Sequence, residues 1–159
     1  MPDTTPQSLI RHTLGTLSYR LGKVLRDTPD TFGDYPHNGD ERTAVRILAH
    51  INDLLDGSLR KLAGNLAWQD SEPLTWTREI ERFYQAIAAL DARIASSGLG
   101  DCAPERLFQG PIADAFTHTG QLAMMRRLAG ISIKGENYYL AEISTGTVGP
   151  AQAAPRREF

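Results

Sequence analysis

The segment DAFTHTGQLAMMRR (Asp114–Arg127) places a carboxylate and an imidazole four residues apart. In a helix, which turns by about 100° per residue, Asp114 and His118 lie only about 40° apart and point the same way. Apolar residues of this region lie within about 60° of that direction: Leu107, Pro111, Ala115, Leu122, Met125 and Ala129. The pattern therefore predicts that Asp114 and His118 point into an apolar interior, where an ionised carboxylate needs a hydrogen bond, a protonated imidazole or a metal ion.

A second imidazole is available in the segment RILAHINDLL. His50 lies one turn after Ile47 and one turn before Leu54, at the margin of an apolar stripe, so it too can face inward. His50, Asp114 and His118 together form a three-ligand set of nitrogen and oxygen atoms. A divalent ion accepts such a set and keeps positions open for water or substrate. We expect zinc or nickel, with iron or manganese as alternatives.

The same residues have a simpler explanation. A carboxylate and a histidine four apart on a helix can form an ordinary ion pair, and His50 can be a core histidine bonded to a backbone carbonyl. Spacing alone leaves both explanations open. His37, in the polar loop DYPHNGD, is a weaker candidate ligand, since a histidine in such a loop is usually solvated.

The elements that must position these residues are helices. Between Pro6 and Arg26, and again between Asp40 and Leu62, apolar residues recur three or four apart, which is the helical period. Asp40 can serve as the N-cap of the second helix. The breaker-rich segment DTPDTFGDYPHNGD separates the two helices and is expected to be a loop.

Two more helices follow. The third is predicted from Pro73, which suits a helix start, to about Ser96. The fourth begins after Pro104 and ends at Gly130, a typical C-terminal stop. Trp68 and Trp76 flank the entry into the third helix and are expected to be packing anchors rather than parts of a substrate site.

These elements predict one all-α domain over residues 1–159, a four-helix bundle over about 7–130 with an irregular, extended tail over about 131–159 that wraps it. The roughly ten residues between the second and third helices reach at most about 33 Å, which is the length of a helix of about 22 residues. Parallel and antiparallel arrangements of those two helices therefore both remain open.

Composition excludes several functions. The net charge of −2, with both signs interspersed, gives no basic surface of the kind that nucleic acid requires. No apolar run approaches the roughly 18 residues of a membrane span. The lone Cys102 fits a reducing compartment, so we expect a cytoplasmic protein that binds neither nucleic acid nor membrane. Phosphate-binding loops, nucleophile elbows and ferritin-like Glu-x-x-His pairs are all missing from the sequence.

The LAHI segment around His50 and the segment HTGQLAMMRRLAG after Asp114 resemble the DinB-like (YfiT-like) superfamily of metal-dependent helical bundles. In that family one histidine of the second helix and a His-x-x-x-His pair of the fourth bind a divalent ion. His50 and His118 match two of these histidines, and Gly120-Gln121 matches the segment after the last one. Asp114 stands where the family has a histidine, and this harder ligand implies an altered metal preference or a lost site.

The resemblance covers roughly residues 8–130 and implies a function as well as a fold. It favours a metal-dependent S-transferase or hydrolase acting with a low-molecular-weight thiol, and Gln121 would orient His118. Homodimers are frequent among proteins of this fold, so a homodimer is a further expectation. The alternative is a non-catalytic, stress-related binding or interaction protein that inherited an altered or lost metal site.

Overall fold

The computed structural model describes residues 5–36 and 42–159. His37 and Asp40, the loop histidine and the predicted N-cap, lie outside this part of the chain. Within it the protein is all-α, as the sequence predicts, and it contains no strand. None of the helices in these residues combines the length and the apolar character that a membrane crossing requires.

The first two long helices are α1 (Pro6–Leu25) and α2 (Ala44–Leu62), close to the predicted ranges. Between them lies a short 3-10 helix, η1 (Asp30–Asp34), where a loop was expected. Packing against Trp76 holds this turn, because the ring of Phe32 meets that of Trp76 edge-on at 5.2 Å between centroids. Gly33 permits the approach, since a Cβ atom there would lie 2.8 Å from Trp76 Cβ.

The third helix, α3 (Trp76–Ser97), begins three residues after Pro73, the predicted start. Thr75 is its N-cap, and the Oε1 atom of Glu79 accepts a hydrogen bond of 2.9 Å from the backbone N–H of Leu74. Because a carboxylate inside the first turns binds the chain just before the helix, the start is fixed by Glu79 rather than by proline.

The predicted fourth helix contains a change of winding. It consists of α4 (Pro104–Leu107), a π-helical turn η2 (Phe108–Ile112) and α5 (Ala113–Leu128). Pro111 lies inside η2. Because proline has no N–H to donate, it disrupts the regular α-helical hydrogen bonding at this point. Gly130, with φ of 76°, follows the end of α5 and confirms the predicted stop.

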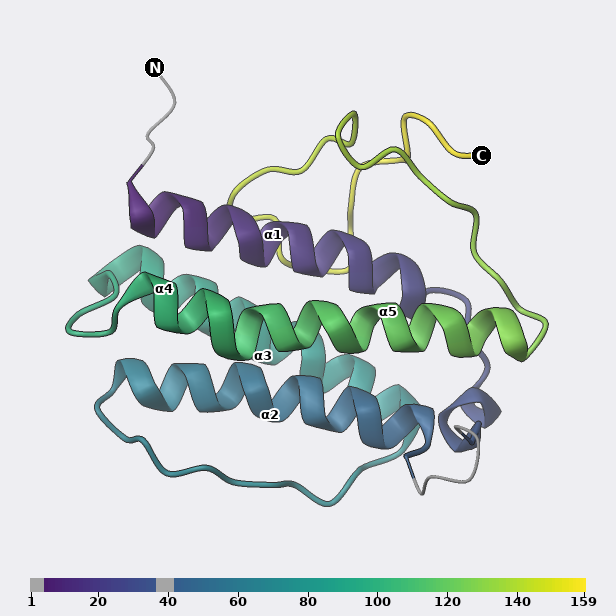
Figure 1. The fold of residues 1–159 in the computed structure, drawn as a ribbon, viewed down its shortest axis with the longest axis horizontal. Helices are drawn as coiled ribbons and strands as arrows, with labels where there is room; N and C mark the ends of the chain where they lie inside the picture. The colour runs from purple at the N-terminus through teal and green to yellow at the C-terminus, as the bar shows by residue number, and fades with distance from the viewer. Residues whose placement is uncertain (1–4, 37–41) are drawn as a thin grey trace.

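The four long helices of the described residues pack in pairs: α2 contacts α3 and α5, and α1 contacts the same two helices (Figure 1). Apolar side chains from all of them fill the centre. The largest fully buried ones are Phe83, Leu14, Leu17, Leu21, Leu48, Ile51, Leu55, Ile87, Leu90, Ile94, Leu107 and Ile112. Helices α2 and α5 are thereby held side by side, which is what the candidate site requires.

The orientation of α2 relative to α3, which the sequence leaves open, is parallel. Asn52, in the middle of α2, bonds to Glu79 near the start of α3, and Leu62 O, at the end of α2, accepts a hydrogen bond from Arg93 near the end of α3. The segment 63–75 accordingly runs back along α2 before α3 begins (Figure 1). Its length suffices for that return.

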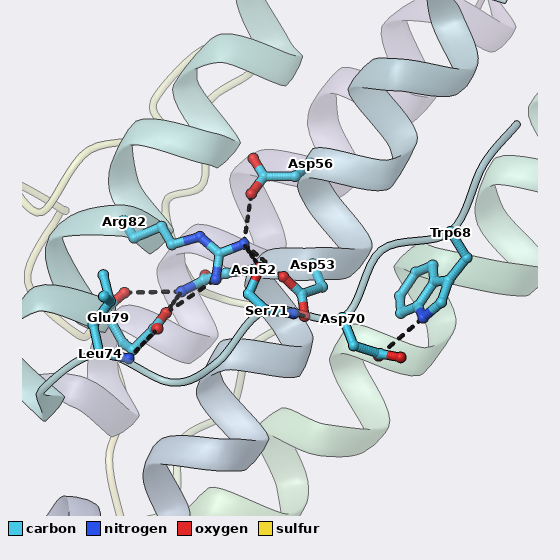
Figure 2. A network of polar contacts seen from close by, with 9 residues as sticks. All are labelled: Asn52, Asp53, Asp56, Trp68, Asp70, Ser71, Leu74, Glu79 and Arg82. Atoms are coloured by element: carbon cyan, nitrogen blue, oxygen red, sulfur yellow. Dashed lines mark hydrogen bonds and ion pairs between the residues drawn. The ribbon is translucent and has the colours of Figure 1, made fainter. Parts of the chain in front are cut away.

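A polar network joins α2, α3 and the returning segment (Figure 2). The guanidinium of Arg82 donates to Asp53 at 2.6 Å and to Asp56 at 2.7 Å, and its other terminal nitrogen lies 3.4 Å from Glu79. Asp53 also accepts a hydrogen bond from the backbone N–H of Ser71. One arginine thus pairs with three carboxylates and ties α2 to α3.

Residues 131–159 cross α1 without forming a regular helix or strand (Figure 1). They are held by a buried cluster in which Glu136 accepts hydrogen bonds from Tyr19 at 2.6 Å and from Lys23 at 2.8 Å. Lys23 also donates to Glu158, and an isolated antiparallel bridge joins Glu136 to Glu158. This cluster lies on α1. The three candidate ligands lie on α2 and α5, so the tail is anchored away from them.

Candidate metal centre

His50, Asp114 and His118 meet between α2 and α5. The Nε2 atom of His50 lies 3.3 Å from Oδ2 of Asp114, and Nε2 of His118 lies 3.3 Å from Oδ1 of the same carboxylate. The two imidazole rings pack edge to face with 4.8 Å between their centroids. The structure therefore brings together all three residues that the sequence predicts as ligands.

The surroundings are less apolar than the sequence predicts. The side chain of His118 is 11% exposed, but that of His50 is 35% exposed and that of Asp114 is 45% exposed. The expectation that Asp114 points into an apolar interior is therefore wrong. Asp114 stands in the first turn of α5 and lines a cavity open to solvent, so water already satisfies part of its charge.

Gln121 fixes the protonation pattern of His118. Its Oε1 atom lies 2.7 Å from Nδ1 of His118, and an amide oxygen can only accept, so this amide orientation favours the tautomer with the hydrogen on Nδ1. Nε2 of His118 then faces Asp114 with either a proton or a lone pair. A lone pair facing a carboxylate at this distance is repulsive unless a cation lies between them. A metal ion between the two atoms would remove this repulsion.

The spacing fits a metal site. Each residue offers one ligand atom, and these atoms all lie within 4.8 Å of one another. Two ligands of a tetrahedral ion, each at about 2.0–2.1 Å, are roughly 3.3 Å apart, close to the two nitrogen–oxygen separations here. The most favourable N–H···O hydrogen bonds are shorter, at about 2.9–3.0 Å. The partly exposed side chains of His50 and Asp114 have room to close the remaining distance, so this group could hold a metal ion.

Two cavities meet at Asp114. The first, of about 490 Å³, is lined by Arg42, Arg46, Ile47, His50, Asp114 and His118. The second, of about 520 Å³, is also lined by Asp114, together with residues that include Lys61, Trp68 and Thr117. Both volumes suit small-molecule sites, which span roughly 300–1,000 Å³. The first cavity therefore reaches all three candidate ligands, and the second reaches Asp114.

Trp68 is not the packing anchor that the sequence predicts. Trp76 is 3% exposed and is a packing anchor as expected, but Trp68 is 45% exposed and its ring lies 5.8 Å from that of His50. Its indole N–H donates to Asp70 within the returning segment (Figure 2). Only the parallel arrangement of α2 and α3 brings this segment beside His50, and the sequence leaves that arrangement open.

Replacing Gln121 with alanine is expected to weaken metal binding by about 10- to 100-fold, because partners that orient a ligand histidine have effects of this size. The variant loses the acceptor of His118 Nδ1–H while all three ligands remain. Competition against a chromophoric chelator measures the change. Gln121→Glu, which keeps an acceptor, should retain most of the affinity, and Gln85→Ala, at an exposed position of α3, should have no effect. Equal affinities for Gln121→Ala and wild type would refute this role.

No family model matches the chain, and no curated protein or solved structure is similar to it.

Proposed function

We propose that this chain is a DinB-like protein in which α1, α2, α3 and α5 form a four-helix bundle that binds one divalent ion through His50, Asp114 and His118. One observation carries the proposal: Gln121 directs the hydrogen of His118 to Nδ1 while Nε2 faces a carboxylate oxygen at 3.3 Å. A metal ion between these atoms would stabilise the arrangement, and a second imidazole stands beside the same carboxylate.

The donor set favours zinc or nickel, with iron or manganese as alternatives, because imidazole nitrogens suit these ions and a carboxylate widens the choice. When bound, a divalent ion with an open position would lower the pKa of a coordinated water or hold a thiolate for attack on an electrophile. Asp114 supplies the negative charge that the two neutral imidazoles lack. Gln121 keeps the His118 ring oriented, and the partly buried position of His118 limits its movement.

The reaction that fits this site best is thiol transfer or hydrolysis on a small molecule. Two cavities are lined by Asp114, which gives room for two reactants, such as a low-molecular-weight thiol and an electrophile. We assign the protein to the cytoplasm, where thiols are abundant and the lone Cys102 stays reduced. A homodimer through apolar helix faces remains part of the proposal.

A thermal-shift screen with low-molecular-weight thiols tests this reaction class. The metal-loaded protein should be stabilised by at least one thiol, because a ligand that binds only the folded state raises the melting temperature. The same thiol should give no shift after chelation. A flat response in both conditions would contradict the thiol version, and hydrolysis would then be examined with activated esters.

A second candidate function follows from the exposure of Asp114. A carboxylate that is 45% exposed can simply pair with a protonated His118, without any metal. The protein would then be a non-catalytic, stress-related binding or interaction protein. Comparing Asp114→Ala with wild type, with and without chelator, separates the two functions.

A further inference from the structure

Arg46 lies beside the three candidate ligands. It lines the same cavity of about 490 Å³ as His50, Asp114 and His118. Because Arg46 precedes His50 by four residues on α2, the guanidinium and the imidazole project from the same face of the helix. A small molecule that reaches the three ligands therefore also meets Arg46.

The position of Arg46 near the start of α2 is unfavourable for a positive charge. It lies in the first turn of α2, where the helix dipole is positive, and this turn contains no acidic residue. Within residues 5–36 and 42–159, no carboxylate forms an ion pair with Arg46, whose side chain is exposed. Asp114 contacts the two histidines instead. An anion in the cavity would offset this charge.

We infer that the substrate carries a carboxylate, which Arg46 binds while the reacting donor atom of the substrate is directed to His50, Asp114 and His118. This inference rests on the proposed metal site. A guanidinium matches a carboxylate through two parallel hydrogen bonds and discriminates against neutral groups. With a divalent ion bound, the charged side chains that line the cavity, Arg42, Arg46 and Asp114, leave a net positive charge, so the cavity attracts anions.

Two thiols that differ in charge test the inference on protein loaded with Co²⁺. Both 3-mercaptopropionate and 3-mercapto-1-propanol offer a thiolate to the ion, and its charge-transfer absorption reports binding, but only the first carries a carboxylate. The acid should bind about tenfold more tightly, the effect of one charged hydrogen-bonding partner. Arg46→Gln should abolish this preference, so that the ratio of the two affinities falls to about one. Arg78→Gln, which removes a charge from a 70% exposed side chain of α3, should preserve it.

The metal content of each sample is measured first, so that the two proposals fail separately. If cobalt is bound and the acid shows no preference, or if the preference survives in Arg46→Gln, the inference is wrong while the metal site stands. If cobalt is bound but neither thiol binds, the inference is also wrong. If no cobalt is bound, the metal site and the inference fall together.

Discussion

Replacing Asp114 with alanine is expected to remove the stabilisation that a divalent ion gives the folded protein. An ion that binds only the folded state adds about 4 kcal/mol when its free concentration exceeds the dissociation constant by about 1,000-fold. For a chain of this size that corresponds to roughly 8–16 °C in melting temperature. Asp114→Ala lacks one of three ligands and should melt lower than metal-loaded wild type by this amount.

In chelator the difference should nearly vanish. The side chain of Asp114 is 45% exposed, and a partly exposed ion pair contributes at most about 1 kcal/mol. Thermal melts of both proteins, with excess metal and with chelator, give the comparison. Asp101→Ala, at an exposed position after α3, is the matched control and should not alter the response to metal. Equal destabilisation by Asp114→Ala in both conditions would favour a simple ion pair.

Replacing Arg82 with methionine is expected to lower the free energy of unfolding by about 3–5 kcal/mol, the cost of removing one partner of a buried ion pair. Arg82 is 20% exposed and faces Asp53, 5% exposed, and Glu79, fully buried. Its removal leaves these carboxylates and Asp56 without their cation (Figure 2). Chemical denaturation measures the loss, and Arg78→Met should change stability by no more than about 0.5 kcal/mol. Equal stability of the two variants would contradict the role of the network.

The same network makes stability depend on pH. Burial alone would raise the pKa of Asp53, but hydrogen bonds from Arg82 and Ser71 outweigh it, so the pKa of Asp53 is lowered. A carboxyl group with a lowered pKa in the folded state contributes stability that is present above its unfolded pKa and is lost as the pH falls through the folded value. Unfolding curves at decreasing pH should show this loss in wild type. The loss should be smaller in Arg82→Met, which has no cation to protect the carboxylate.

The long helices are predictable because periodicity is a local property of the sequence. Apolar residues three or four apart in α1, α2 and α3 describe the buried faces directly. The π-helical turn around Pro111 is harder to predict from the sequence. A proline in a helical pattern predicts a disruption, but it does not predict whether the helix stops, kinks or widens. The short helix η1 depends on the ring of Trp76, which is distant in sequence.

The candidate site also has features that the sequence predicts and features that it does not. His50, Asp114 and His118 follow from helical spacing, because each lies on the face that its helix turns toward the other. The exposure of Asp114 does not follow, since it depends on the cavity between α2 and α5. Trp68 and Arg46 reach the site through the return of segment 63–75 and through the shape of that cavity, and no local pattern contains either.

The central claim is that His50, Asp114 and His118 bind one divalent ion. The most direct measurement is the metal content of the full chain, purified without a histidine tag, after incubation with zinc, nickel, manganese or iron and removal of unbound ion. The proposal predicts one tightly held ion per chain for zinc or nickel, and its loss in a variant with alanine at Asp114 and His118. If wild type retains no more metal than this variant after any of the four incubations, the three residues are not a metal site.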